Sequence, residues 1–330
     1  MSNLRAGLIG MGMMGKNHAR ILSKLNGVDF IGVVDPVKSE KSLTESGGLK
    51  IFHGLDQLLS ENLDYCVIAA PTGFHKEIAV EMLNAGVHCL IEKPVATDIK
   101  SALEVQRAAV KNSRVVGIGH IERYNAAIRQ LKSKLQSNEL GKIYQISLVR
   151  QGPFPSRIAG VGVVRDLATH DIDLSMWLTE SQYSSISAQT SKIKTLEYED
   201  LVSITGRLKN DVVVNMVTNW LSPHKVRSIV VLGENGAFHA DTLNSDLTYY
   251  RNGTSTTSHD VVAHFRGLVE GDVTKFSFEK IEPLLLEHEN FRDHLTGKSS
   301  EIVTIEEGIE TIKISDAIIR IGKTGESEKF

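Results

Sequence analysis

The sequence predicts an α/β protein of two domains, and three observations support this class. In roughly the first 120 residues, short and almost continuously apolar runs alternate with segments of helical spacing, which is typical of a parallel sheet covered on both faces. Farther along, strand-like runs follow one another directly, and several alternate apolar and polar residues, which is typical of an antiparallel sheet with one solvated face. A length of 330 residues suits two domains better than one core.

The composition excludes several classes of protein. A net charge of −3 lacks the basic excess of a general nucleic-acid binder. No apolar run reaches the roughly 18 residues of a membrane span, and the first strand begins too early for a signal peptide, so we expect a cytoplasmic protein. Cys66 and Cys89 lie inside apolar runs and are expected to be buried thiols.

The elements of the first half follow in a regular order. Strands are expected at 6–9, 30–34, 65–70, 87–91 and 115–118, and helices at 16–25, 74–85 and 98–110. Between residues 35 and 65 lie a polar segment, the residues 51–53 and a short amphipathic piece at 56–60. Gly86 stands where a helix C-cap is expected. In a parallel sheet of this kind, ligands bind at the carboxyl ends of the strands.

The second half begins with a helix expected at 124–135 and continues mainly with strands. These are expected at 143–150, 183–191, 201–208, 212–220, 226–232, 237–240 and 247–250. Further helices are expected at 166–178, at 282–295 and from residue 304 onward. Thr304 and Glu307 have the spacing of a capping box at the start of the last helix.

The turn after the first strand predicts a dinucleotide site. A strand that turns at Gly10 and leads into a helix leaves backbone N–H groups and the positive end of the helix dipole for a pyrophosphate. Gly12 lets the backbone approach the phosphates, and Gly15 lets the helix pack closely on the sheet. The alternative is an ordinary tight turn. The expected cofactor contacts here are Gly10, Gly12, Met13, Met14 and Gly15.

Asp35 closes the second strand, twenty residues beyond Gly15, where a carboxylate binds the ribose hydroxyls of a dinucleotide. The same carboxylate repels a 2′-phosphate, and Lys38 is the only cation nearby in the sequence. NAD is therefore favoured over NADP as the cofactor.

Two further segments follow strands of the parallel sheet. Pro94 disfavours a helical conformation at Lys93, so the lysine can project toward the cofactor cleft. The alternative is a solvated surface lysine. The residues expected at the cofactor from these two strand ends are Ala70, Pro71, Thr72, His75, Glu92 and Lys93.

Asp166 and His170 are four residues apart, on one face of the helix expected at 166–178. An Asp that accepts a hydrogen bond from one ring nitrogen fixes the tautomer of the histidine and makes the other nitrogen a better general base. The alternative is an acidic helix N-terminus with a histidine merely nearby. Because no cluster of His or Cys accompanies the pair, a metal site is not expected.

These motifs, in this order and spacing, resemble the glucose-fructose oxidoreductase / inositol dehydrogenase / MocA family over essentially the whole chain. The resemblance implies a Rossmann domain at 1–121 and an α+β domain at 122–330, with an open, mainly antiparallel sheet through which homodimers or homotetramers form. It also implies NAD(P)-dependent oxidation or reduction of a sugar or cyclitol hydroxyl. Lys93, Asp166 and His170 are then the catalytic residues.

Residues 119–125 and 150–158 resemble the branch of this family that oxidises the 3-hydroxyl of UDP-N-acetylglucosamine or its uronic acid. Arg123, Arg150 and Arg157 could pair with a diphosphate, although some of them could instead be surface residues or subunit contacts. The segment 161–165 departs from the glycine-rich run of the family, which leaves local substrate contacts open. The substrate contacts expected are Lys93, Tyr124, Asn125, Arg150, Arg157 and His170.

The expected mechanism has His170, oriented by Asp166, removing the hydroxyl proton while Lys93 stabilises the alkoxide-like oxygen. Lys93 as the base is the open alternative. Two other functions compete. A cyclitol dehydrogenase or ketoreductase of the same fold needs no arginines to bind a diphosphate. A non-catalytic dinucleotide-binding sensor needs none of the residues Lys93, Asp166 and His170.

Overall fold

The computed structural model describes residues 3–36, 49–155, 160–195, 197–253 and 270–330. The chain divides into two compact units, one of residues 1–121 with 282–313, the other of residues 122–281 with 314–330. Residues 282–313 therefore belong with the first unit and not, as expected from the sequence, with the second domain. The physical reason is burial, because Phe291 of this segment packs in one core cluster with Leu8 and Leu22.

The first unit contains a six-stranded sheet in the order β3-β2-β1-β4-β5-β6, and all its strand pairs are parallel. Its strands are β1 (Leu4–Ile9), β2 (Val28–Val34), β3 (Ile51–Phe52), β4 (Tyr65–Ile68), β5 (His88–Glu92) and β6 (Val116–Gly119). Tyr65 and Val67 face one hydrophobic core, and Cys66 and Ile68 face the other. Burial on both faces explains the continuous apolar runs in the sequence.

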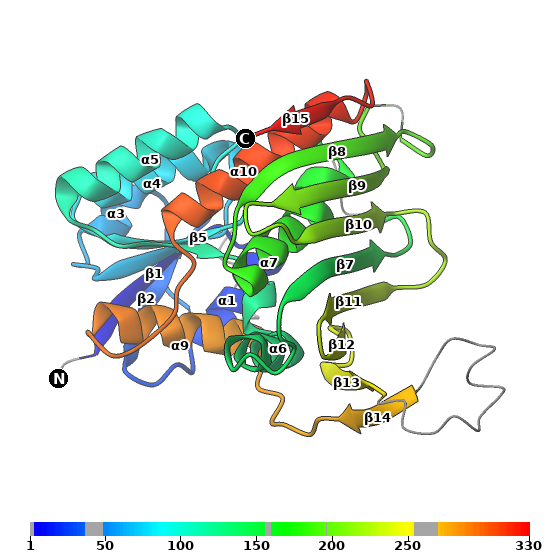
Figure 1. Cartoon of the computed structure of the whole chain (residues 1–330). Coiled ribbons are helices and arrows are strands. Elements are labelled where there is room, and N and C mark those ends of the chain that lie inside the picture. Colours follow the sequence, from blue (N-terminus) through cyan, green and yellow to red (C-terminus); the bar gives the residue numbers. More distant parts are fainter. Residues whose placement is uncertain (1–2, 37–48, 156–159, 196, 254–269) are drawn as a thin grey trace, which may run out of the picture. The chain divides into compact units, whose positions relative to one another are not determined.

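Helices cover both faces of this sheet. Figure 1 shows α3, α4 and α5 on one face and α1 and α9 on the other. The helices are α1 (Met13–Leu22), α3 (Leu55–Leu59), α4 (His75–Asn84), α5 (Ile99–Asn112), α9 (Pro283–Leu295) and α10 (Ile305–Ile321), with a 3₁₀ turn η2 (Thr72–Phe74) before α4.

The ends of these helices follow the sequence signals. Gly86, with φ +85°, follows α4. The capping box before α10 is confirmed, since the N–H of Thr304 donates to the Glu307 carboxylate at 2.8 Å and the N–H of Glu307 donates to Thr304 Oγ1 at 3.3 Å.

The second unit contains a nine-stranded sheet in the order β14-β13-β12-β11-β7-β10-β9-β8-β15, in which β7 and β10 pair in parallel and the other pairs are antiparallel. Its strands are β7 (Ile143–Gln151), β8 (Tyr183–Ser191), β9 (Leu201–Leu208), β10 (Val213–Asn219), β11 (Val226–Gly233), β12 (Gly236–Asp241), β13 (Asp246–Asn252), β14 (Glu270–Lys275) and β15 (Ser327–Lys329). The sequence did not predict β14 and β15, because both are short and mainly polar and lack the apolar alternation of the other strands.

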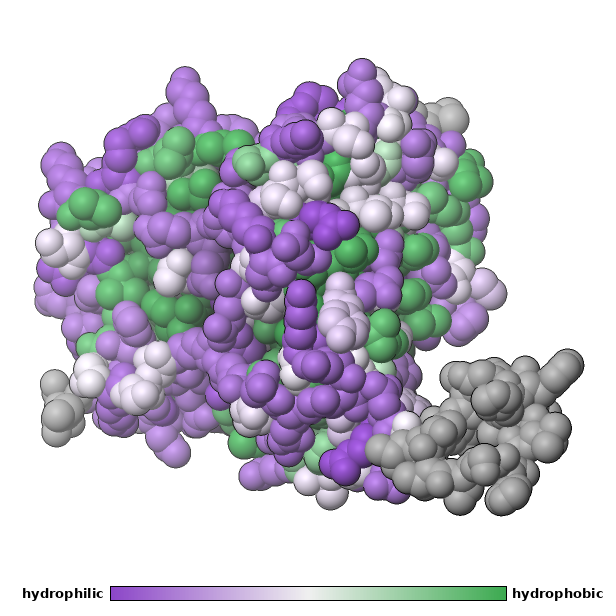
Figure 2. Space-filling model, viewed as in Figure 1, coloured by the Kyte–Doolittle hydropathy of each residue, from purple (hydrophilic) through white to green (hydrophobic). Residues whose placement is uncertain are grey.

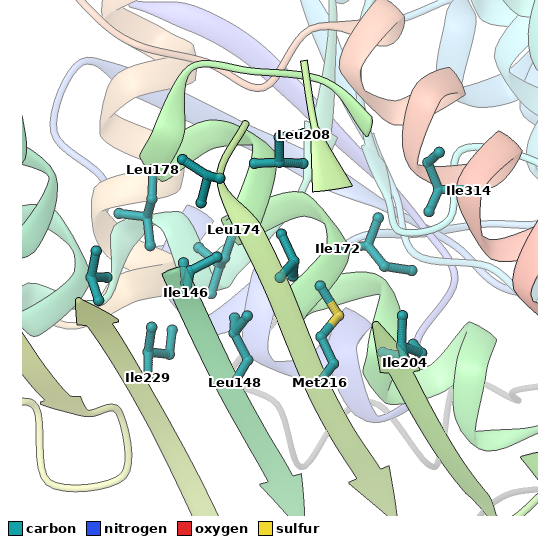
Figure 3. Packing of buried hydrophobic residues seen from close by; sticks show 14 of the residues in the cluster. Ile146, Leu148, Ile172, Leu174, Leu178, Ile204, Leu208, Met216, Ile229 and Ile314 are labelled. Atoms are coloured by element: carbon teal, nitrogen blue, oxygen red, sulfur yellow. The ribbon is translucent and has the colours of Figure 1, made fainter. Parts of the chain in front are cut away.

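One face of this sheet carries the hydrophobic core of the second unit. Figure 3 shows Ile146 and Leu148 of β7 beneath Ile172 and Leu174. The helical segments of this unit are η3 (Ile121–Tyr124), α6 (Ala126–Gln136), a π-helix η4 (Val164–Ala168) and α7 (Thr169–Thr179), together with the end of α10. β9 alternates buried residues with exposed ones, so side chains on its other face are not covered by α7.

The surface is mainly polar on the face drawn in Figure 2, where hydrophobic residues form small groups between hydrophilic ones. Among the residues that the structure describes, no helix is long and apolar enough to cross a membrane.

Candidate functional site

The turn between β1 and α1 has the shape of a phosphate cradle. Gly10 adopts φ +95°, and a Cβ atom there would lie 2.7 Å from the backbone of Ala69. A Cβ at Gly15 would overlap the carbonyl oxygen of Gly10. At Gly12, by contrast, a Cβ would meet no atom within 4 Å. Packing therefore requires the first and third glycines, while the second borders open space at the N-terminus of α1.

That N-terminus suits an anion. Gly12 is the N-cap residue of α1, and within the described parts of the chain no side chain caps the helix. Backbone N–H groups at an uncapped N-terminus are donors for a phosphate, which the helix dipole also attracts. The residues of the turn therefore fit a pyrophosphate, as the sequence predicts.

Asp35 lies beside this turn. It follows β2, which pairs with β1 up to Ile9 opposite Val34. Its Oδ2 accepts a hydrogen bond from the N–H of Met11 at 2.7 Å. The structure thus brings the acidic residue and the glycine-rich turn together, as a ribose-binding carboxylate requires. Lys38 lies outside the described residues.

His75 connects the loops after β4 and β5. Its Nε2 lies 2.8 Å from the carbonyl oxygen of Ala70, and its Nδ1 lies 2.9 Å from that of Pro94. Burial lowers the pKa of His75 more than the two carbonyl contacts raise it, so a neutral ring donates to one carbonyl at a time. His75, with 1% exposure, holds the two loops, and the cofactor contact expected for it stays a prediction. Pro71 and Thr72 remain accessible.

Glu92 and Lys93 follow at the end of β5, and the Lys93–Pro94 peptide bond is cis. Glu92 Oε2 accepts a hydrogen bond from the N–H of Lys93 at 3.1 Å, and Oε1 lies 3.0 Å from Nε2 of His18. Burial raises the pKa of Glu92, but the His18 hydrogen bond and the Lys93 charge outweigh it and hold the pKa below its usual range. Glu92 is therefore a carboxylate at neutral pH.

Asp166 and His170 lie where a π-helix passes into α7 in the second unit. Asp166 is in the π-helix, and His170 is in the first turn of α7 with 9% exposure. The sequence predicted an α-helix from residue 166, but the structure differs because the turn before Thr169 is wider than an α-turn. The hydrogen bond expected between Asp166 and His170 stays a prediction. Such π insertions are frequent at functional sites.

Glu199 holds the start of this π-helix, a role that the sequence did not reveal. Its backbone carbonyl accepts from the N–H of Val163 at 2.8 Å, and its Oε1 accepts from the N–H of Val164 at 3.2 Å. A Cβ atom at Gly162 would overlap the Glu199 carboxylate. The segment 161–165 that departs from the family pattern is therefore packed around a buried acid.

Arg150 and Arg123 occupy buried ion pairs instead of the exposed positions that a diphosphate clamp needs. Arg150 is 3% exposed and donates to Asp171 at 2.8 Å and to Glu122 at 2.9 Å. Arg123 is 5% exposed and donates through Nε to Asp173 at 2.8 Å. A guanidinium shielded from water needs such carboxylate partners.

These two ion pairs join α7 to other elements. Asp171 directly follows His170 and Asp173 lies three residues after it, so Arg150 of β7 and Arg123 of η3 fix the turn that carries the histidine. The structure thus gives both arginines a positioning role, and the expected contact of Arg150 with substrate stays a prediction. Arg157 lies outside the described residues.

Tyr124 and Asn125 are also buried, with 3% and 6% exposure. Asn125 caps α6, since its side-chain oxygen accepts from the N–H of Ala127 at 3.0 Å, and its amide donates to the carbonyl of Thr242 at 3.0 Å. The Asn125 side chain therefore has a structural use that the sequence did not reveal.

The two cysteines are free, buried thiols on neighbouring strands, with their sulfur atoms 3.7 Å apart. Burial and the neighbouring thiol raise the pKa of Cys89 well above its usual value, which makes it unreactive. In the described part of the chain, no group of three or more His, Cys, Asp or Glu side chains is placed to hold a metal ion.

Comparison with known proteins covers both units. Residues 4–120 match the model of the oxidoreductase family with an NAD-binding Rossmann fold, and residues 128–239 match the GFO/IDH/MocA C-terminal domain. The UDP-N-acetylglucosamine 3-dehydrogenase of Acidithiobacillus ferrooxidans is 30% identical over 258 residues, 78% of this chain and 80% of that protein. The glucose-6-phosphate 3-dehydrogenase of Bacillus subtilis is 32% identical over 265 residues, 73% of this chain and 75% of that protein.

A solved structure agrees with these matches. The UDP-N-acetylglucosamine 3-dehydrogenase of Acidithiobacillus ferrooxidans superposes with a TM-score of 0.85 at 25% identity, over 97% of this chain and 98% of that one. The motifs, the parallel sheet with its glycine-rich turn and the two family models agree. This chain therefore belongs to the glucose-fructose oxidoreductase / inositol dehydrogenase / MocA family of oxidoreductases, with an N-terminal NAD-binding Rossmann domain.

Proposed function

We propose that this protein is an NAD-dependent dehydrogenase that oxidises a secondary hydroxyl of a phosphorylated sugar. The first candidate is the 3-hydroxyl of a UDP-N-acetylhexosamine or its uronic acid. The observation that carries the proposal is the hydrogen bond from Met11 to Asp35, which holds an acidic residue beside the phosphate cradle. Membership of an oxidoreductase family supports the class of reaction.

The choice of substrate rests on the relatives. Two of them are named for oxidation at position 3 of a hexose, one carrying a nucleoside diphosphate and one carrying a phosphate. Arg123 and Arg150 do not discriminate between these sugars, because both are engaged in ion pairs. Glucose 6-phosphate is therefore the second candidate, and an unphosphorylated cyclitol is the third.

Residues of the first unit would hold the cofactor. The backbone from Gly10 to Gly15 and the N-terminus of α1 would bind the pyrophosphate, and Asp35 would accept from the ribose hydroxyls while disfavouring a 2′-phosphate. The strand-end residues would line the rest of the cofactor; these are Ala70, Pro71, Thr72, Glu92 and Lys93. NAD supplies the hydride acceptor.

The chain supplies the proton chemistry. In our proposal, His170 takes the proton of the substrate hydroxyl, and Asp166 fixes its tautomer. The Lys93 ammonium donates a hydrogen bond to the same oxygen and stabilises the negative charge that develops there. If Lys93 loses its proton on substrate binding, it can serve as the base instead.

Two measurements test this proposal. The first is the affinity for NADH and NADPH, for which we expect a preference for NADH of at least about 10-fold from the carboxylate of Asp35. The second is NADH formation from NAD with UDP-N-acetylglucosamine, its uronic acid, glucose 6-phosphate and myo-inositol. Tight NADH binding without turnover of any sugar would favour the sensor, and absence of NADH binding would contradict the whole proposal.

A further inference from the structure

We propose that His18 and His288 are positioning residues that hold the Glu92 carboxylate in place for the bound dinucleotide. This inference rests on the proposed function and goes beyond it, because neither histidine is among the site residues expected from the sequence. It arises from a chain of three polar side chains inside the first unit.

Hydrogen bonds between these three side chains link α1, β5 and α9. His18 lies on α1, three residues after Gly15, and its Nε2 is 3.0 Å from Oε1 of Glu92 at the end of β5. Its Nδ1 is 2.8 Å from Nε2 of His288 on α9. Both histidines are 1% exposed. Hydrogen bonds this well buried have a defined geometry and are costly to leave unmade.

The ionised carboxylate of Glu92 determines which group donates in the first of these contacts. The ionised carboxylate of Glu92 accepts, so Nε2 of His18 carries a proton and donates it. Between the two rings, one of the two nitrogens that face each other, Nδ1 of His18 and Nε2 of His288, donates and the other accepts. Nδ1 of His288 has no hydrogen-bond partner among the described residues. Burial lowers the pKa of His288 well below its usual range, which agrees with a neutral ring that has one N–H.

Glu92 is thereby held at both oxygens. Oε2 accepts from the backbone of Lys93 and Oε1 accepts from His18, while the side chain keeps 12% exposure. The second contact ties the carboxylate to the helix whose N-terminus forms the phosphate cradle. Each oxygen retains a lone pair for a ligand hydroxyl. A dinucleotide that is bound at the cradle and reaches Lys93 has such hydroxyls on its ribose.

The charges around Glu92 determine its response to pH. His18 faces it from α1, Glu287 and His288 lie on α9, His75 lies on α4, and Lys93 follows it in the chain. Burial and the charge of Glu92 raise the pKa of Glu287 well above its usual range, so Glu287 is neutral. Without the hydrogen bond from His18, burial would dominate and raise the pKa of Glu92.

The experiment measures the dissociation constant of NADH in the full-length protein, between about pH 5.5 and 8, by fluorescence and calorimetry. His18→Gln keeps an amide N–H near the position of Nε2, whereas His18→Asn reaches only the position of Nδ1. We expect His18→Asn to weaken binding about 10-fold and His18→Gln less than about 3-fold. In His18→Asn, the loss of affinity on acidification should begin about one pH unit higher than in the wild type.

A double-mutant cycle separates positioning from general packing. If His18 acts through Glu92, His18→Asn should change NADH affinity less than about 2-fold once Glu92→Gln is present. If His18→Asn does not fold, His288→Phe removes the hydrogen bond between His288 and His18 instead. We expect this variant to lose NADH affinity as well, but less than His18→Asn.

His88→Asn is the matched control. His88 lies at the opposite end of β5, where its Nδ1 accepts from the N–H of Val115 at 2.8 Å. Asparagine can still accept from Val115 but loses the contact of His88 Nε2 with Arg114, so this variant should lower the melting temperature slightly and leave NADH affinity unchanged. Additive effects of His18→Asn and Glu92→Gln, or an unmoved pH profile, would overturn the inference while the proposed function stands. A wild type that binds no NADH would overturn both.

Discussion

Glu287 carries a carboxyl group that the first unit buries with 1% exposure. Neither of its oxygens has a hydrogen-bond partner in the part of the chain that the structure describes. Burial and the Glu92 charge raise its pKa well above the usual value. Keeping this group protonated at neutral pH costs stability, because in the unfolded chain it would release its proton near about pH 4.3.

This cost predicts how Glu287→Gln changes stability with pH. Above about pH 4.3 the folded state keeps a proton that the unfolded state releases, so this group lowers the free energy of unfolding as pH rises toward the folded pKa. Glutamine resembles the neutral acid and has no proton to release, so it removes this pH-dependent loss of stability. We expect the free energy of unfolding of the variant, relative to that of the wild type, to rise by up to about 1.4 kcal/mol per pH unit from pH 5 upward. Urea unfolding at several pH values checks this, and a difference independent of pH would contradict it.

Lys93 and His170 carry the proposed chemistry, and their replacement should separate catalysis from cofactor binding. We expect Lys93→Ala and His170→Ala each to lower turnover at least about 10²-fold, because each removes a group that stabilises or deprotonates the reacting oxygen. NADH binding should persist in both. His53→Ala, an exposed histidine of the first unit, is the control. Near-normal turnover in both active-site variants would show that other residues carry the reaction.

At the scale of elements, three buried polar contacts hold the turn from the π-helix into α7. Glu199 holds the start of the π-helix, and Arg150 and Arg123 hold the first turns of α7 through Asp171 and Asp173. Burial raises the pKa of Asp171 even against the attraction of Arg150. The energetic role of Arg150 is therefore to compensate a buried carboxylate beside His170.

Arg150→Met tests whether this arginine positions α7 or binds substrate. Its loss leaves the buried carboxylate of Asp171 without its partner, so we expect the free energy of unfolding to fall by about 3 kcal/mol. Arg150→Met combined with Asp171→Asn should recover part of that loss. Denaturant unfolding of the single and double variants measures both. If the stability is unchanged and the KM for the phosphorylated sugar rises, Arg150 binds the substrate, as expected from the sequence.

At the scale of the whole molecule, the nine-stranded sheet has one face that α6 and α7 do not cover. β10 alternates buried residues with half-exposed ones, and its half-exposed Val217 pairs with Val149 of β7. Val230 of β11 pairs with Ser147 of the same strand. Valine side chains on a broad sheet face are suited to association between subunits.

We expect the protein to form a homodimer or homotetramer through this face. Val217→Lys places a charge in the middle of the sheet, so it should dissociate the assembly at micromolar concentration while the subunit stays folded. Light scattering coupled to gel filtration measures the mass, and circular dichroism checks the fold. Val110→Lys, at an exposed valine of α5 in the first unit, is the control. An unchanged assembly in Val217→Lys would place the interface elsewhere.

Much of the architecture could be predicted because its signals are local. Continuous apolar runs predicted the buried parallel strands, and alternation predicted most of the second sheet. Gly10 and Gly15 indicated a tight turn because only glycine fits there, and Thr304 with Glu307 indicated the start of α10. Each of these features depends on backbone geometry and periodicity over a few residues.

Other features depended on residues far apart in the chain. The order of elements, the dinucleotide turn and its acidic residue followed from the sequence by itself, since a strand, a turn and a helix carry their own patterns. Only the tertiary structure decided that Arg150 serves Asp171, that α9 belongs with the first unit and that His18 joins Glu92 to His288. A buried charge or imidazole must find a polar partner. Which partner it finds depends on how the whole chain folds, and no local pattern records that choice.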